Sequence, residues 1–143
     1  MTVLWIVYII GIAILVAEFR RPLRADELIE VSEPMRYGKA AWMGDECAGH
    51  IMANGQPFNP AELTCACWDF PMGAKLLVTH GPRLVVVTVT DRGPAAPLCA
   101  HGRIIDLSYA AFCQLAPPNI GVIEVSVQRI IEQPEALREI PAL

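Results

Sequence analysis

Two aspartates have sequence surroundings in which a carboxyl group could transfer protons during catalysis. Asp91 follows the apolar segment 85–90 and precedes the turn-forming run 92–94, and Asp106 lies within the short apolar segment 104–107. A carboxyl group at the rim of an apolar wall can have a raised pKa, which lets one group act first as an acid and then as a base. Both residues also have a structural interpretation, because Asp often caps a turn or a helix.

The cysteine and histidine content allows two further kinds of site. Five cysteines in a small exported domain favour disulfide bonds, with one thiol left over. A zinc site is the alternative, although the spacing of Cys65-x-Cys67 and Cys99-x-His101 differs from the usual Cys-x2-Cys knuckle. The other members of such a site would be Cys47, His50 and Cys113. We therefore predict no bound metal and no cofactor.

The composition describes one small acidic domain. The chain has 143 residues, of which 54% are hydrophobic and 18% charged, with a formal net charge of −4. This length and apolar content support a single packed core. An acidic domain without a cluster of Lys and Arg neutralises phosphates poorly, so we expect no nucleic acid as a partner. The sequence contains neither a Gly-rich phosphate loop nor a Gly-x-Ser-x-Gly motif.

The N-terminal segment has the length of a membrane helix. Residues 1–17 carry no charged side chain, and the apolar run 3–17 is just long enough to span a bilayer. We predict that residues 1–25 form a signal peptide or membrane anchor. The three arginines after the run would place the domain in the cytoplasm by the positive-inside tendency, whereas the cysteine count favours export. We expect export to the periplasm or cell envelope, with inner-membrane association through residues 3–17.

The rest of the chain divides into a linker, a folded domain and a tail. The polar residues 26–36 are predicted as the linker, residues 37–131 as the domain, and residues 132–143 as the tail. Within the domain, short β-branched runs separated by Gly and Pro indicate strands. The predicted strands are 39–43, 76–79, 84–90, 104–107 and 122–130.

Turns and helices are predicted between these strands. Residues 80–83 suit a hairpin connection, and 59–63 one helical turn capped by Asn59. Residues 108–115 have helical composition, with Asp106 or Ser108 as the cap. In the last strand the more apolar face is predicted to point to the core, and its residues are Ile123, Val125, Val127 and Arg129. Short strands with one small helix are typical of a compact β-barrel.

Four stretches of the domain match, in order, the motifs of a known family. Gly38–Gly44 is similar to an opening strand that ends Trp-Tyr-Gly, and Met52–Phe58 to a Thr-Ala-Asn-Gly-Glu-x-Phe turn. Leu63–Gly73 is similar to Leu-Thr-Ala-Ala-His-x-x-Leu-Pro-Phe-Gly. The strongest match joins Val89–Pro94 to Arg103–Ser108, which resemble Asn-Asp-Arg-Gly-Pro and Arg-x-Ile-Asp-Leu-Ser. Together these stretches resemble the RlpA-like (rare lipoprotein A) double-psi β-barrel family.

The resemblance implies a fold and an activity. The fold would be a mainly β, six-stranded double-psi β-barrel with one or two short helices, preceded by the hydrophobic N-terminal helix. The family includes lytic transglycosylases, which cleave the bond between N-acetylmuramic acid and N-acetylglucosamine and leave a 1,6-anhydro end. One carboxyl group can serve this reaction as acid and base, whereas glycoside hydrolases usually need two. More distant relatives include barwin-like proteins and expansins, and expansins loosen walls without clear hydrolysis.

The resemblance also implies roles for single residues. Asp91 would be the catalytic acid and base, and Asp106 is the second catalytic candidate. In active members of the family a Glu and a His assist the aspartate, and Gln56 and Cys67 stand at the corresponding positions here. The predicted substrate-binding residues are Asn54, Gln56, Trp68 and Arg92.

The two tryptophans of the domain receive different predictions. Trp68 lies in a loop, where its apolar face can stack on a sugar ring, whereas Trp42 lies in a strand and is predicted to pack in the core.

The sequence as a whole therefore predicts a membrane-targeted domain that binds peptidoglycan glycan strands and cleaves them as a lytic transglycosylase. A non-catalytic glycan-binding or wall-loosening module on the same barrel is the alternative, and the loss of the Glu and the His favours it. A protein-interaction module is a third class, for which the residues give no positive sign.

Overall fold

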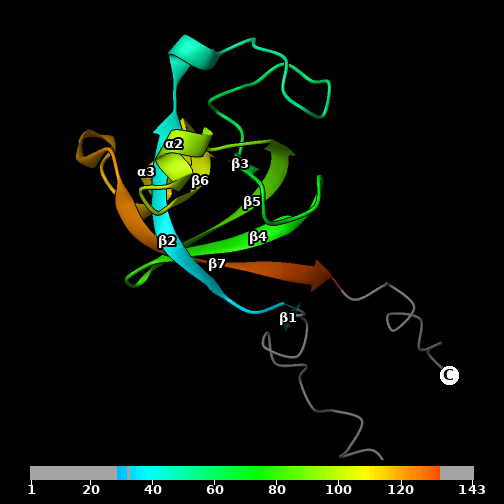
Figure 1. The fold of residues 1–143 in the computed structure, drawn as a ribbon, viewed down its shortest axis with the longest axis vertical. Coiled ribbons are helices and arrows are strands. Elements are labelled where there is room, and N and C mark those ends of the chain that lie inside the picture. The colour runs from blue at the N-terminus through cyan, green and yellow to red at the C-terminus, as the bar shows by residue number, and fades with distance from the viewer. Residues whose placement is uncertain (1–28, 32, 133–143) are drawn as a thin grey trace, which may run out of the picture. The chain divides into compact units, whose positions relative to one another are not determined.

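The computed structural model describes residues 29–31 and 33–132 (Figure 1). Residues Glu30–Glu132 cluster as one unit. The predicted signal peptide or anchor at 1–25, with its apolar run 3–17, and residues 133–143 of the predicted tail lie outside the described residues. None of the helices in the described segments has the length and apolar character needed to cross a membrane.

The described chain contains seven strands. They are β1 (Ile29–Val31), β2 (Arg36–Met43), β3 (Thr64–Cys67), β4 (Lys75–His80), β5 (Arg83–Asp91), β6 (Arg103–Ser108) and β7 (Ile123–Glu132). All five predicted strands are confirmed: four lie within β2, β4, β5 and β6, and the fifth matches β7, which begins one residue later than predicted. The prediction missed β3, and it missed β1, which lies in the segment 26–36 for which a linker is expected.

Short helices connect the strands: η2 (Asp45–Cys47), α2 (Ala96–Cys99), α3 (Tyr109–Leu115) and η3 (Pro118–Ile120). The predicted helix is α3, and Ser108 caps it, because Ser108 Oγ accepts a hydrogen bond from Ala111 N at 3.3 Å. Of the two predicted caps, Ser108 is therefore the one used, and Asp106 is not engaged in that role. At the predicted turn near residue 59, Asn59 Oδ1 accepts a hydrogen bond from Ala61 N at 3.0 Å.

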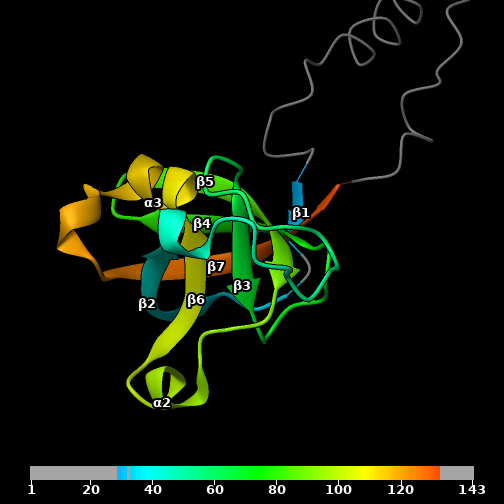
Figure 2. The ribbon, with the colours of Figure 1, turned by 90° about the horizontal axis from the view of Figure 1, so that it is seen from above.

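Six of the strands close into a barrel (Figure 2). The order in the sheet is β1-β7-β2-β6-β3-β5-β4, and β4 pairs with β7 to close the ring. The pairs β2–β6 and β3–β5 are parallel, and they flank the antiparallel pair β3–β6. The β4–β5 hairpin pairs His80 with Arg83, as predicted. Two parallel pairs that meet along one antiparallel contact in a closed sheet of six strands agree with the predicted double-psi β-barrel.

Alternate residues of the strands build the core. In β5, Val85, Val87 and Val89 are buried, while Leu84 before them and Val86 between them are exposed. β7 turns the predicted face inward, with the buried residues Ile123, Val125 and Val127. Burying each of these side chains contributes about 1.5–3 kcal/mol to stability, so the alternation fixes which face of each strand meets solvent.

Trp42 packs against this core as predicted. Its indole nitrogen donates a hydrogen bond to Pro118 O at 2.9 Å. Its ring meets the ring of Tyr109 edge to face, with centroids 5.2 Å apart. The indole therefore joins β2 to α3 and η3 rather than presenting a flat face to solvent.

Candidate active site

The two predicted catalytic aspartates lie in one row across three strands. Ala66 of β3 pairs with Asp91 of β5 on one side and with Asp106 of β6 on the other. Neighbouring strands are about 4.8 Å apart, which places the two aspartate Cα atoms roughly 10 Å from each other. Figure 2 shows β3 and β6 side by side in the barrel wall. Residues 15 positions apart in the sequence thus lie in one row of the barrel wall.

A β-bulge turns Asp91 toward the same face of the sheet as Ala66. Cys65 pairs with Val89, and both are buried in the core. The next residue of β3, Ala66, pairs with Asp91 instead of Thr90, because the register shifts by one residue at this point. Without the shift, Asp91 would follow the alternation of Val89 and face the core. A bulge that redirects a side chain in this way is a common feature next to active sites.

Backbone N–H groups hold the carboxylate of Asp91. Its Oδ1 accepts hydrogen bonds from Ala53 N at 2.9 Å and from Arg92 N at 2.8 Å. The bond from Arg92 N is the turn cap that the structural interpretation expects, and the bond from Ala53 comes from a separate loop. Asp91 remains half-buried. One carboxylate oxygen is fixed in position while the residue keeps access to solvent.

Asp106 lies in a more enclosed setting. The residue is only 8% exposed, and its Oδ1 accepts a hydrogen bond from Arg103 Nε at 2.8 Å within an ion pair. Burial raises the pKa of the Asp106 carboxyl, and the Arg103 guanidinium partly opposes this rise. Oδ2 faces Gly93, since a Cβ atom placed on Gly93 would lie 3.6 Å from it. Asp106 is therefore a buried acid at the edge of the turn that follows Asp91.

The loop that contains Asn54 and Gln56 docks onto the end of β5. Asn54 N donates a hydrogen bond to Thr90 O at 3.2 Å, next to the bond from Ala53 N to Asp91. The Asn54 side chain is used inside the loop, where its Oδ1 accepts a hydrogen bond from Gln56 N at 3.0 Å. Gln56 is exposed. Of these two predicted substrate-binding residues, Gln56 has the side chain available to a ligand, and Asn54 shapes the turn that presents it.

Arg92 and Trp68 are joined through the turn after Asp91. Arg92 Nη1 donates hydrogen bonds to Cys67 O and Phe70 O, both at 2.7 Å, so the guanidinium holds the loop that leaves β3. Trp68 lies on that loop, is 59% exposed, and donates from its indole nitrogen to Pro94 O at 2.7 Å. The hydrogen bond fixes the ring while leaving much of it exposed, as a stacking platform requires.

Cys67, at the position where the resemblance implies a His, faces away from the aspartates. It is 2% exposed and belongs to the core cluster, and its Sγ lies 3.6 Å from Ile104 O. Burial is the main cause that raises the pKa of its thiol. Strand alternation explains the placement, because Cys65 and Cys67 point inward while Ala66 between them lies in the aspartate row.

The expected disulfides are not found, since all five cysteines, which lie within residues 33–132, are free thiols. In the same part of the chain, no group of three or more His, Cys, Asp or Glu side chains is arranged to hold a metal ion. The buried Cys65 and Cys67 act as small apolar residues of the core, which is a common role for free cysteine.

Sequence reasoning missed three contributors to the site. Ala53 contributes a backbone N–H group, and the type of a residue does not predict such a contact. Arg103 was quoted within a motif but was given no role, although it is the ion-pair partner of Asp106. Gly93 leaves little room for a side chain, because a Cβ atom there would lie 3.2 Å from Ala66 Cβ. The only available signal was that Gly93 and Arg103 belong to the Asp91–Pro94 and Arg103–Ser108 motifs. Membership of a motif does not reveal which residues are in contact.

Fold and site together define a double-psi β-barrel with paired aspartates on its wall, and the comparison with known families agrees. A family model described as "Lytic transglycolase" matches residues 36–127. The chain belongs to this RlpA-like double-psi β-barrel family.

Several curated relatives carry the RlpA name. The endolytic peptidoglycan transglycosylase RlpA of Vibrio cholerae serotype O1 is 36% identical over 95 residues, which are 65% of this chain and 35% of that protein. This chain thus spans about a third of the length of that relative. An uncharacterized protein of Synechocystis is 37% identical over 93 residues, which are 64% of this chain and 94% of that protein.

Solved structures share the barrel. The Streptomyces papain inhibitor superposes with a TM-score of 0.55 at 26% identity, covering 72% of this chain and 99% of that one. An expansin of Clavibacter michiganensis in its apo form gives a TM-score of 0.54 at 25% identity, covering 71% of this chain and 52% of the expansin. The same barrel therefore occurs in proteins with very different names.

Proposed function

We propose that this domain binds peptidoglycan glycan strands and cleaves them as a lytic transglycosylase. The observation that carries the proposal is the row in which Asp91 and Asp106 flank Ala66. The exposed Gln56 and Trp68 lie on the two loops bonded to the β5 end of that row. The RlpA-named relatives support peptidoglycan as the substrate, because they match the segment that contains all of these residues.

In this proposal Asp91 transfers the proton in both directions. The protonated carboxyl gives its proton to the oxygen between N-acetylmuramic acid and N-acetylglucosamine, and the bond from that oxygen to the anomeric carbon breaks. The 6-hydroxyl oxygen of the muramic residue then bonds to the anomeric carbon, and its proton returns to Asp91. The products are a 1,6-anhydro end and a free hydroxyl on the leaving sugar, and no water is consumed. General acid–base transfer of this kind contributes about 100- to 10,000-fold in rate.

The neighbouring groups have supporting roles. The N–H groups of Ala53 and Arg92 hold Oδ1 of Asp91, which leaves Oδ2 for the proton transfer. Asp106 is the second carboxyl of the site, where its charge can stabilise the positive character that develops at the anomeric carbon. Gln56 is placed to hydrogen-bond a sugar hydroxyl or acetamide group, and Trp68 to stack on a sugar ring.

A non-catalytic glycan-binding module is the second candidate function. Two observations favour it: Gln56 cannot exchange a proton, and the thiol of Cys67 is buried in the core. An enzyme with this site would therefore depend on the aspartates alone. In either case we propose that the domain is exported to the periplasm or cell envelope and anchored by residues 3–17, a placement that cell fractionation of the full chain would test.

The deciding experiment incubates the full chain with peptide-free glycan strands and reads the products by mass spectrometry. The variants are Asp91→Asn and Asp106→Asn, with the exposed Asp45→Asn as the matched control. Anhydro ends that the control retains and an aspartate variant lacks would support the enzyme and identify its acid. Strands that stay intact while the protein still sediments with them would rule out the enzyme and support the binding module.

A further inference from the structure

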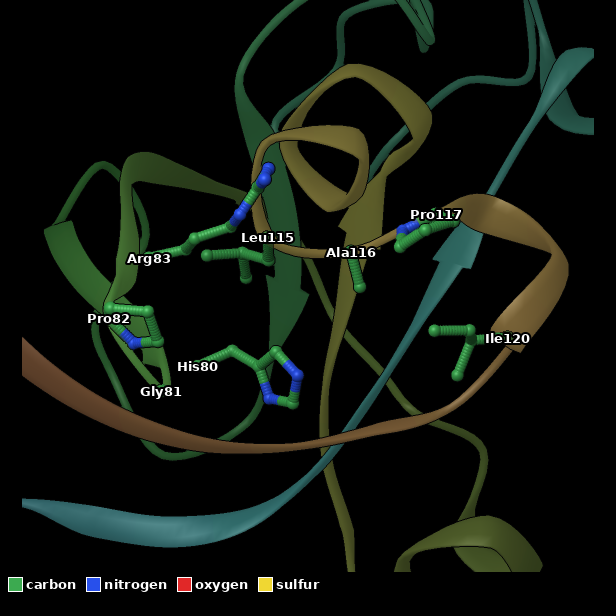
Figure 3. A pocket seen from close by; sticks show the side chains of 8 residues that line it. All are labelled: His80, Gly81, Pro82, Arg83, Leu115, Ala116, Pro117 and Ile120. Atoms are coloured by element: carbon green, nitrogen blue, oxygen red, sulfur yellow. The ribbon is translucent and has the colours of Figure 1, made fainter.

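A cavity of about 280 Å³ lies at the other end of the barrel wall from the aspartates. It opens between the β4–β5 hairpin at residues 80–83 and the segment after α3, at residues 115–117 and Ile120 (Figure 3). Arg83 begins β5 and Asp91 ends it. At a strand rise of about 3.3 Å per residue, the cavity lies roughly 26 Å from the aspartate row. A ligand of this cavity would therefore occupy a separate site.

One side of the cavity is apolar and rigid. Leu115 and Ala116 are buried beneath it, and Ile120 is 55% exposed at its rim. Pro82 and Pro117 complete the walls from the two segments, and neither has a backbone N–H to donate. Figure 3 shows the Ile120 side chain and the His80 ring directed toward the same space. Such a surface suits an aliphatic side chain of a ligand.

The other side of the cavity is polar. His80 Nδ1 donates a hydrogen bond to Glu124 O at 2.7 Å, because a carbonyl can only accept, and this contact orients the ring with Nε2 on its opposite side. Arg83 is exposed. The ion pairs found within the described residues are Arg103–Asp106 and Arg129–Glu33, so Arg83 has no described carboxylate partner. A cation of this kind beside an apolar wall, in a chain of net charge −4, complements a carboxylate.

We propose that this cavity binds the C-terminal end of a partner peptide whose last residue is aliphatic. The terminal carboxylate pairs with the Arg83 guanidinium, and the last side chain packs on Leu115, Pro117 and Ile120. The volume of about 280 Å³ lies just below the range for ligand pockets, which is about 300–1,000 Å³, so the cavity holds one or two residues rather than a folded surface. The site is independent of glycan cleavage at the aspartates.

The test titrates the ¹⁵N-labelled full chain, held in lipid nanodiscs, with N-acetyl-Ala-Leu carrying a free carboxylate. N-acetyl-Ala-Leu amide and N-acetyl-Asp-Leu amide are the comparison probes. We expect the amide signals of Gly81 and Ala116 to shift with the free acid, and much smaller shifts with the terminal amide. Equal shifts with the two amides and the acid would overturn the role of the carboxylate. Stronger binding of the Asp-containing amide would overturn the C-terminal assignment in favour of an acidic side chain.

Two variants check the contacts. Arg83→Gln should raise the Kd about three- to tenfold, since it removes an exposed charged hydrogen bond. Lys75→Gln, at the opposite end of β4, is the matched control and should leave the Kd unchanged. Ile120→Ser should weaken binding by a similar factor. Shifts confined to Ala53 and Arg92, or an Arg83→Gln variant that binds as the parent chain does, would contradict the proposal.

Discussion

The two sides of Ala66 hold an aspartate in opposite ways. On the β5 side, Asp91 is half-buried and bonded to two backbone N–H groups. On the β6 side, Asp106 is buried and bonded to a charged side chain, Arg103. Backbone N–H donors hold a carboxylate in place without bringing a positive charge to it. In a buried ion pair, the removal of one partner leaves the other as an uncompensated buried charge. The β5 side therefore leaves its carboxylate half-exposed to solvent, and the β6 side ties its carboxylate into the barrel wall.

The largest expected effect separates the two sides by activity. Asp91→Asn should lower the rate of anhydro-end formation by about 100-fold or more, because the amide cannot transfer the proton. Its stability should change little, since the Asn Oδ1 still accepts the bonds from Ala53 N and Arg92 N. Product analysis and thermal unfolding of the same sample check both parts. If Asp91→Asn lost activity only because it unfolds, Asp91 would have a structural role, as we expect for Asp106, and the two aspartates would not differ in function.

The next effect concerns stability on the β6 side. Arg103→Leu leaves Asp106 buried without its partner, which should lower the free energy of unfolding by about 1–3 kcal/mol. Arg129→Leu is the matched control, because the Arg129–Glu33 pair is longer, at 3.2 Å, and more exposed, and its loss should cost about 1 kcal/mol or less. Urea denaturation measures both. An equal loss of unfolding free energy in the two variants would show that the burial of Asp106 does not make its ion pair more important for stability.

A third change acts on the turn between the two sides. Gly93→Ala places a Cβ atom 3.2 Å from Ala66 Cβ, so the turn must move by a few tenths of an ångström. We expect a stability loss of about 1 kcal/mol and a reduced rate, because the turn joins Asp91 to the chain beside Asp106. The double variant Ala66→Gly with Gly93→Ala should regain part of the rate. Kinetics that are unchanged in the single variant would show that the turn does not position the aspartates.

The smallest effect is a pH dependence from Asp106. Burial raises the pKa of this carboxyl above its ordinary value of 3.8, so the folded chain holds the proton at pH values where the unfolded chain has lost it. The contribution of Asp106 to stability is therefore full below pH 3.8 and falls as the pH rises through the folded-state pKa. Comparing the free energy of unfolding of the parent chain with that of Asp106→Asn across this pH range isolates the contribution of Asp106. A difference that is flat with pH would show that the Arg103 charge balances burial, and one that grows as the pH rises would show that the charge outweighs burial.

Local patterns predicted much of the fold, because burial on one face leaves a period in the sequence. The alternation of Val85, Val87 and Val89 and the hairpin at 80–83 are signals of this kind. β3 was missed because it has only four residues, of which Thr64 alone is β-branched, and because it is buried on both faces and shows no alternation. The count of five cysteines predicted disulfides, but two of these thiols fill the core.

The candidate site was predicted only as far as residue types allow. The loops that carry Gln56 and Trp68 are hydrogen-bonded to Asp91 and Pro94 at one end of β5, and the roles of these residues stay predictions. The bulge at Ala66 depends on how residues 65–66 pair with residues 89–91. The sequence of either segment alone does not determine this register. Arg92 was predicted to bind substrate because its contacts within the protein also depend on tertiary structure. In the structure its Nη1 donates to the carbonyls of Cys67 and Phe70.

The closing strand β7 has a consequence for the order in which the protein can mature. β7 pairs with β2 near the start of the domain and with β4 in its middle, and among the described strands it is the last to be synthesised. Until residues 123–130 have left the ribosome, both β2 and β4 have an unpaired edge on which other chains can pair. Closure of the barrel therefore waits for β7 to emerge, and a chaperone that covers those edges would protect the nascent chain from aggregation.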